Sequence, residues 1–292
     1  MREGDRFLRV GQDTVRWRID GDPGAPRMLL YNGLVSDALH WRFWIEHYSR
    51  RFSVISWDYR GHGPYDVPRE LDAVSIEGFA RDGAAVLAAA GGGPAVLAGI
   101  SMGVQAALEH ARQRPGDVRA LALLCGTYGH PLDRLGAGPG GRRAAATAAR
   151  MLFAVAPLAR GLMTPLMATG IAREMAFLTG GARRDSLPRG ILDELFAHVR
   201  RMHPRVIGTI FASWVHHSAE EALPEIAAPA IIFAGGMDQL TPPALAEVMA
   251  SRMPRATLRV VPGHSHLLQL ERPELVHREV DGWLLREGLA AE

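Results

Sequence analysis

The chain has 292 residues, of which 48% are hydrophobic and 22% are charged, and its 33 basic and 31 acidic residues leave a formal net charge of +2. This length and balance fit one large α/β domain, or such a domain with an insertion. All of the basic residues are arginine, scattered along the chain without a basic stripe of interleaved aromatics, so we expect no nucleic-acid binding.

Cysteine content and hydropathy exclude several further classes of protein. Cys125 is the only cysteine, so an intrachain disulfide and a cysteine-based metal site are both ruled out. The first six residues include acidic side chains and lack an apolar core, unlike a signal peptide. Charged residues, glycine or proline interrupt every apolar stretch before it reaches the roughly 18 residues of a membrane-spanning helix. We therefore expect a cytoplasmic protein without stable membrane insertion, and nothing here predicts its oligomeric state.

The first 125 residues alternate predicted strands with predicted helices. Polar and apolar residues alternate in the first two strands, at 7–10 and 14–19, as in half-buried antiparallel strands. Continuous apolar strands are then expected at 27–31, 52–57, 94–100 and 118–125, with helices between them at 37–48, 75–90 and 104–112. This alternation predicts a mostly parallel, doubly wound sheet whose strands share one carboxyl edge.

The alternation stops at residue 126 and returns near residue 224. A glycine-rich stretch at 136–141 is interpreted as a flexible connector, and four predicted helices follow it, at 144–153, 171–178, 191–202 and 206–217. Strand patterns return at 230–234 and 257–261, which makes eight strands, and the last helix is expected at 273–286. We therefore predict a core of residues 1–126 and 224–292, with residues 127–223 inserted as a helical cap.

One short motif after the fifth strand is typical of a nucleophile. Gly99, Ser101 and Gly103 form Gly-x-Ser-x-Gly between an apolar run and a predicted helix. A serine on such a sharp turn needs a strained backbone, so its neighbours two positions away must be small. The helix start adds partial positive charge where an oxyanion would form. A glycine-rich turn with a capping serine is the alternative, and the strand–turn–helix context favours a nucleophile.

A serine nucleophile needs a base, and the base needs a group that orients it. Asp238 follows the strand at 230–234, before a helix that we expect Thr241 to cap. Two histidines, His264 and His266, follow the last strand. Either could be the base, and the chain order serine, aspartate, histidine is that of an α/β-hydrolase triad.

These motifs make the chain resemble the α/β-hydrolase superfamily, in its esterase/lipase-like group with a helical cap. The resemblance implies the α/β-hydrolase fold and a Ser101–Asp238–His266 triad that needs no metal or organic cofactor. In that family the base lies five residues before a Glu-x-Pro sequence. Counting back from Glu271 favours His266 as the base, with His264 as the alternative.

The resemblance also implies an oxyanion hole made of two backbone N–H groups, those of Leu34 and Met102. The family usually carries His-Gly at the end of the third strand, where this chain has Asn32 and Gly33. Because backbone N–H groups donate the hydrogen bonds, the change of side chain does not remove a donor.

The resulting hypothesis is a serine hydrolase that cleaves a carboxylic ester, lactone or thioester through an acyl-enzyme. The alternatives are a ligand-binding or signalling member of the fold with little turnover, and a perhydrolase or C–C bond hydrolase with the same triad. An apolar stripe at 151–167, charged only at Arg160, predicts a small-molecule hydrophobic ester-type substrate, with medium-chain esters preferred over acetates and charged esters. That stripe could equally pack the cap, as could Trp41 and Trp214, and so could the methionines Met151, Met163, Met167 and Met175.

Overall fold

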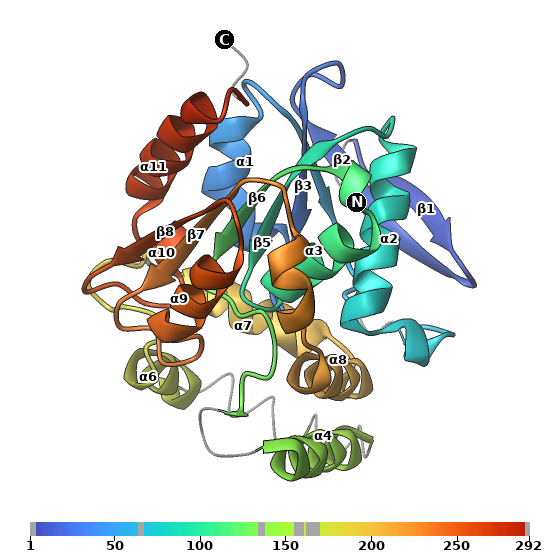
Figure 1. The fold of residues 1–292 in the computed structure, drawn as a ribbon. Helices are drawn as coiled ribbons and strands as arrows, with labels where there is room; N and C mark the ends of the chain where they lie inside the picture. Colours follow the sequence, from blue (N-terminus) through green and yellow to red (C-terminus); the bar gives the residue numbers. More distant parts are fainter. Residues whose placement is uncertain (1–3, 64–66, 134–137, 155–160, 162–169, 290–292) are drawn as a thin grey trace.

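The computed structural model describes residues 4–63, 67–133, 138–154, 161 and 170–289. One eight-stranded sheet runs through the molecule in the order β1-β2-β4-β3-β5-β6-β7-β8 (Figure 1). Only the pairs β1–β2 and β2–β4 are antiparallel, which confirms the mostly parallel sheet. The strands are β1 (Arg6–Val10), β2 (Asp13–Asp20), β3 (Arg27–Tyr31), β4 (Ser53–Trp57), β5 (Ala95–Ile100), β6 (Val118–Leu124), β7 (Ala230–Gly235) and β8 (Ala256–Val261).

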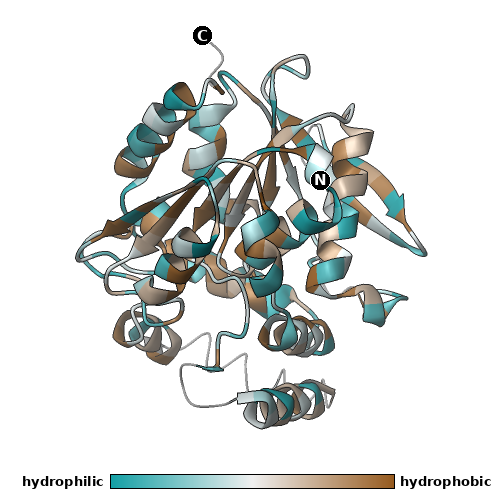
Figure 2. Ribbon diagram, in the orientation of Figure 1, coloured by the Kyte–Doolittle hydropathy of each residue, from teal (hydrophilic) through white to brown (hydrophobic). Residues whose placement is uncertain are grey.

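Helices cover both faces of the sheet, as a doubly wound fold requires. On one face α2 (Ile76–Ala89) packs against α3 (Met102–Gln113), and on the other α1 (Arg42–Tyr48) packs against α11 (Pro273–Arg286). The central strands are apolar and buried on both sides, which is why they appear as continuous brown arrows in Figure 2.

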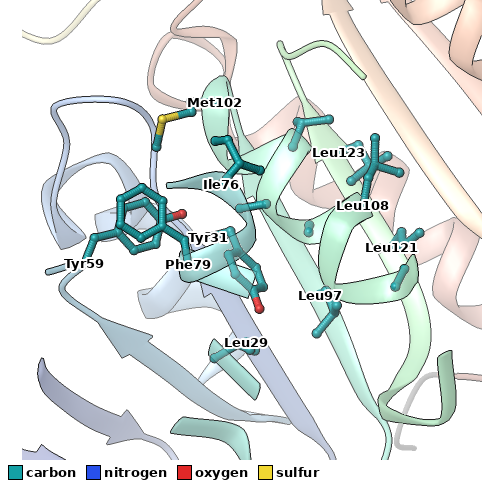
Figure 3. Packing of buried hydrophobic residues seen from close by; sticks show 14 of the residues in the cluster. Leu29, Tyr31, Tyr59, Ile76, Phe79, Leu97, Met102, Leu108, Leu121 and Leu123 are labelled. Carbon is teal, nitrogen blue, oxygen red and sulfur yellow. The ribbon is translucent and has the colours of Figure 1, made fainter. Parts of the chain in front are cut away.

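The period of two along a strand divides the core into two clusters. In β3, Leu29 and Tyr31 point to the face covered by α2 and α3, where they pack with Phe79 and Leu97 (Figure 3). Met28 and Leu30, the alternate residues, belong to the cluster on the opposite face. The sheet is therefore fixed from both sides, and the loops at its carboxyl edge start from rigid strands.

The chain between β6 and β7 contributes helices and no strand to the sheet in its described part. These helices are α4 (Gly138–Ala154), α6 (Gly170–Leu178), α7 (Ile191–Arg201) and α8 (Pro204–His216), gathered at one end of the molecule (Figure 1). An isolated bridge between Gly129 and Ser218 brings the two ends of this segment together. We refer to residues 127–223 as the helical insertion. None of the helices in the described part of the chain is long and apolar enough to cross a membrane.

Of two local predictions, one is confirmed with a change of helix type and the other is wrong. The helix expected at 37–48 begins as a 3-10 turn (Ala38–Trp41), capped by the Asp37 side chain that accepts the Leu39 N–H, and continues directly into α1. The glycine-rich stretch is not a connector throughout, since Gly138 opens α4. Packing of α4 against α8 overrides the poor helix propensity of its glycines. Residues 134–137, including the first part of that stretch, lie outside the described residues.

Candidate active site

Ser101 occupies a strained turn between β5 and α3. Its φ of 55° and ψ of −122° are unusual for a residue with a side chain, and such a conformation costs of order 1–3 kcal/mol. The flanking glycines are necessary because the chain approaches itself closely here. A Cβ on Gly99 would lie 2.5 Å from the carbonyl oxygen of Gly103, and one on Gly103 would lie 2.1 Å from that of Tyr31. The predicted turn is therefore present, with the serine at its tip.

Three loops bring the predicted serine, histidine and aspartate into one hydrogen-bonded chain. The Nε2 atom of His266 lies 2.9 Å from the Ser101 hydroxyl oxygen, and its Nδ1 lies 2.7 Å from a carboxylate oxygen of Asp238. A carboxylate only accepts, so it selects the tautomer that carries the proton on Nδ1 and leaves Nε2 free to accept from the serine hydroxyl. These three residues follow β5, β8 and β7 respectively, at the carboxyl edge of the sheet.

The surroundings of His266 shift its pKa upward. Burial of the ring opposes protonation, but the adjacent Asp238 carboxylate, through its charge and its hydrogen bond, outweighs that effect, and Glu271 adds a smaller contribution. The pKa of His266 is consequently raised above its ordinary value of 6.5. A more basic imidazole accepts the proton of a serine hydroxyl more readily.

Thr241 holds the aspartate in place, a role that the sequence prediction missed. Its hydroxyl donates to one Asp238 oxygen at 2.7 Å, and its N–H donates to the other at 2.9 Å, together with the N–H of Leu240 at 2.8 Å. Thr241 is not the predicted cap of α9 (Pro243–Arg252), because Pro242 occupies that position. An aspartate at the end of a strand often accepts the N–H two residues on in an Asx turn, and this signal could have found the bond from Leu240.

The alternative histidine, His264, contacts a different carboxylate. Its Nδ1 lies 3.3 Å from Glu271, whose side chain is fully buried. Glu271 also accepts hydrogen bonds from the N–H of Ser265, at 3.1 Å, and from the Ser265 hydroxyl. The glutamate of the Glu-x-Pro sequence therefore fastens the loop that carries His266.

The two residues predicted to donate to the oxyanion both lie near the serine. Met102 is the first residue of α3, so its N–H belongs to the helix turn that lacks intrahelical acceptors. Leu34 lines the same cavity as Ser101, and a Cβ on the preceding Gly33 would lie 3.4 Å from the Ser101 Cβ. The Asn32 side chain donates to the Trp57 carbonyl oxygen at 2.8 Å and accepts from Trp41 Nε1 at 3.0 Å, which anchors this loop.

A cavity of about 270 Å³ opens beside Ser101. Its walls are mainly apolar, formed by Leu34, Val35, Ile100, Trp214, Leu240 and Leu267. Trp214 therefore lines the cavity, whereas Trp41 is fully buried in the core. No group of three or more histidine, cysteine or acidic side chains within the described ranges is arranged to bind a metal ion.

The predicted apolar stripe is described only in part. Residues 155–160 and 162–167 lie outside the described residues, and with them Met163 and Met167. Of the remainder, Met151 and Leu152 are exposed, as is Met175 in α6. The apolar walls of the cavity thus come from loops after β3 and β7, from β5, from α8 and from the histidine loop.

The helical insertion also contacts the histidine loop, through its backbone and through the side chain of Arg183. The carbonyl oxygen of Gly180 accepts the N–H of His266 at 3.0 Å. The N–H of Arg183 donates to Glu271 at 2.7 Å, and its guanidinium donates to the Gly263 carbonyl oxygen at 2.7 Å. The segment around residues 180–183 therefore holds both ends of the loop that positions His266.

A family model described as "Alpha/beta hydrolase family" matches residues 28–279 of the chain, which includes every residue of this site. The chain belongs to the alpha/beta hydrolase family. Among curated proteins, this hydrolase is 27% identical over 282 residues to a protein of Azorhizobium caulinodans provisionally named as the carbamate hydrolase RutD, a match that covers 95% of this chain and 97% of the relative.

Solved structures agree with the family assignment at the level of the fold. MenH from S. aureus superposes with a TM-score of 0.76 at 18% identity, over 93% of this chain and 98% of that one. The enol-lactonase from Burkholderia xenovorans LB400 superposes with a TM-score of 0.72 at 19% identity, over 96% and 100% of the two chains. The family match therefore shows a hydrolase, and the solved structures show that it has the corresponding fold.

Proposed function

We propose that this α/β hydrolase cleaves an uncharged carboxylic ester or lactone through an acyl-enzyme formed on Ser101. The observation that carries the proposal is the continuous hydrogen-bonded chain from Asp238 through His266 to Ser101. Ser101, at the end of this chain, lines an apolar cavity. A serine, a base and an orienting carboxylate in this order are the parts that acyl transfer requires.

In the proposed reaction His266 Nε2 takes the proton of the Ser101 hydroxyl as the serine oxygen attacks the substrate carbonyl carbon. Asp238 stabilises the imidazolium, and the N–H groups of Leu34 and Met102 donate to the oxyanion. The imidazolium then protonates the leaving alkoxide, which departs and leaves the acyl-enzyme. His266 next takes a proton from water as the water oxygen attacks the carbonyl carbon of the acyl-enzyme. The imidazolium then returns that proton to the Ser101 oxygen as the acid is released.

The cavity supports a small, uncharged substrate. Among the described residues no arginine, aspartate or glutamate lines the cavity, and its volume of about 270 Å³ lies below the roughly 300–1,000 Å³ of pockets for drug-sized ligands. This volume favours short acyl chains over the medium-length chains that the apolar stripe predicts. The names of the relatives, a carbamate hydrolase and an enol-lactonase, also describe cleavage at a carbonyl carbon. We further propose that residues 127–223 act as a cap, with Trp214 as its contribution to the cavity wall.

Turnover of p-nitrophenyl butanoate and octanoate by the wild type and by Ser101→Ala tests the proposal. We expect the substitution to reduce kcat/KM at least about 10⁴-fold, because the nucleophile is lost, and butanoate to be the better substrate. Circular dichroism and the thermal midpoint of the variant control for folding. Retained turnover in folded Ser101→Ala contradicts the mechanism, and a single stoichiometric turnover by the wild type favours a ligand-binding protein.

A further inference from the structure

One end of the cavity beside Ser101 carries polar atoms that the proposed mechanism does not use. Ser36 is only 2% exposed, and its hydroxyl has no hydrogen-bond partner in the described part of the protein. The Nδ1 atom of His40 is likewise buried without a partner among the described residues. Both residues line the cavity, so a molecule bound there lies against these side chains.

Buried polar groups in folded proteins nearly always find a partner, and beside a cavity that partner is a bound molecule or an ordered water. A hydroxyl buried without one loses its hydrogen bonds to bulk water and gains none in return. Ser36 and His40 are therefore expected to be satisfied when the cavity is filled by a suitable ligand.

The polar end lies next to the reacting atoms. A Cβ on Gly33 would lie 3.2 Å from the Ser36 hydroxyl oxygen and 3.4 Å from the Ser101 Cβ, so both serines adjoin the same glycine. Ser36 also follows Leu34, a proposed oxyanion donor, by two residues on one loop. A group bound to Ser36 is thus held a short distance from the carbonyl that Ser101 attacks.

The polar end of the cavity, formed by Ser36 and His40, is uncharged at neutral pH. Burial lowers the pKa of His40 to about 4, which the nearby Asp37 only partly offsets, and the neighbouring His266, His198 and Arg42 lower it further. A serine hydroxyl and a neutral imidazole can each donate or accept a hydrogen bond. Neither compensates the buried charge of a carboxylate or an ammonium group, so an uncharged partner fits best.

We infer that Ser36 and His40 form a subsite for an uncharged hydrogen-bonding substituent, a hydroxyl or keto group, close to the scissile carbonyl of the substrate. The inference rests on the proposed ester hydrolysis and specifies its substrate class. The preferred substrates are short hydroxy- or oxo-substituted esters and lactones, ahead of plain alkyl esters and of esters with a carboxylate.

Matched ester pairs test the subsite. The first pair is methyl butanoate and methyl 3-hydroxybutanoate, with the hydroxyl on the acyl side. The second is ethyl butanoate and 2-hydroxyethyl butanoate, with the hydroxyl on the alcohol side. In at least one pair, kcat/KM measured by pH-stat should be about tenfold higher for the hydroxy ester, the amount expected for one hydrogen bond to a buried group. Monomethyl succinate, which carries a carboxylate, should be the poorest substrate.

Substitutions assign the preference to the two residues. Ser36→Ala should bring the ratio within the preferred pair to about one, and His40→Phe, which keeps a ring but removes both nitrogens, should lower it. Ser251→Ala is the matched control, since it removes an exposed hydroxyl bonded to the Val248 carbonyl oxygen in α9 and should keep the wild-type ratio. Equal rates within both pairs, or a preference unchanged in both Ser36→Ala and His40→Phe, would overturn the inference.

Calorimetric binding of the same esters to Ser101→Ala separates this inference from the proposed function. Tighter binding of a hydroxy ester than of its parent, lost when Ser36→Ala is added, supports the subsite even where the wild type shows no turnover, and only the proposed function then fails. Ser101-dependent turnover with no preference in rate or binding overturns the subsite and leaves the proposed function standing.

Discussion

The carboxyl edge of the sheet and the helical insertion contribute to the site in different ways. The edge supplies Ser101, Asp238 and His266 from loops that follow strands of the sheet, and hydrogen bonds within a few residues stabilise the loops that carry Asp238 and His266. The insertion supplies Trp214 to the cavity wall, and backbone groups at Gly180 and Arg183 to the histidine loop.

This difference separates chemistry from selectivity. The reacting groups depend on short-range geometry, such as the turn at Ser101 and the hydrogen bonds around Asp238, and this geometry is encoded in motifs. The cavity shape and the hold on the histidine loop depend on contacts between segments far apart in the sequence. Substitutions at the edge should therefore change kcat most. Substitutions in the insertion should lower kcat less, by displacing the loops that carry the reacting groups.

The largest expected effect lies at the edge and compares its two histidines. His266→Ala should reduce kcat/KM about 10⁴-fold or more, because no base then remains beside Ser101. His264→Ala should lower kcat/KM about tenfold or less, because His264 contacts Glu271 rather than Ser101 and can affect the base only by shifting its loop. Steady-state ester hydrolysis by the two purified variants checks this, and the reverse order would show that the base is assigned to the wrong histidine.

Within the helical insertion, the largest effect on kcat is expected for a substitution at Gly180. A Cβ there would lie 2.1 Å from the carbonyl oxygen of Met237, the residue before Asp238, and the Gly180 carbonyl accepts the His266 N–H. Gly180→Ala should therefore displace both loops and lower kcat about a hundredfold, the scale of a 1 Å misplacement. Gly190→Ala is the matched control, because Gly190 in the same insertion also has a positive φ but has open space around it. Equal kcat values for the two variants would contradict a positioning role for the insertion.

The pH dependence of kcat/KM tests the assignment of His266 as the base and of Asp238 as its partner. The base must be neutral to accept the serine proton, and the pKa of His266 is raised above 6.5, mainly by Asp238 acting against burial. The kcat/KM should thus fall as pH decreases through a midpoint above 6.5, about tenfold per unit below it. Asp238→Asn removes the carboxylate, so its residual activity should show a midpoint at lower pH. A wild-type midpoint below 6.5, or one unmoved in Asp238→Asn, would argue against Asp238 as the partner of the base.

The smallest effect is expected at Thr241. Thr241→Val removes the hydroxyl that donates to Asp238 and should lower kcat about tenfold, the scale of one hydrogen bond to a charged group. Thr241→Ser restores the hydroxyl and should return kcat close to the wild-type value. If Thr241→Ser is as slow as Thr241→Val, the methyl packing rather than the hydrogen bond supports Asp238.

Much of the fold and the reacting groups could be predicted from the sequence because their signals are local. The first two strands follow from alternating polar and apolar residues, the other six from apolar runs separated by helical patterns, and Ser101 follows from two glycines at fixed spacing. The count from Glu271 selected His266, the histidine that the structure places beside Ser101 and Asp238. Here a buried glutamate leaves a readable pattern because its hydrogen bonds span only a few residues.

The rest depends on tertiary contacts that no local pattern encodes. The helix start at Gly138 requires packing of α4 against α8. Trp214 reads equally well as core or as cavity wall until α8 is placed in space. The free hydroxyl of Ser36 is visible only once every neighbour is known, because a serine in a loop is ordinarily exposed and solvated.

Covalent labelling of the nucleophile tests the central claim most directly. The protein is treated with a serine-directed p-nitrophenyl phosphonate, and the adduct is located by intact mass and by peptide mass spectrometry. The account predicts one adduct per chain on the peptide that contains Ser101, none at that position in Ser101→Ala, and labelling slowed at least about a hundredfold in His266→Ala. Ester turnover by a wild-type protein that carries its adduct on another residue, or no adduct at all, would contradict the account.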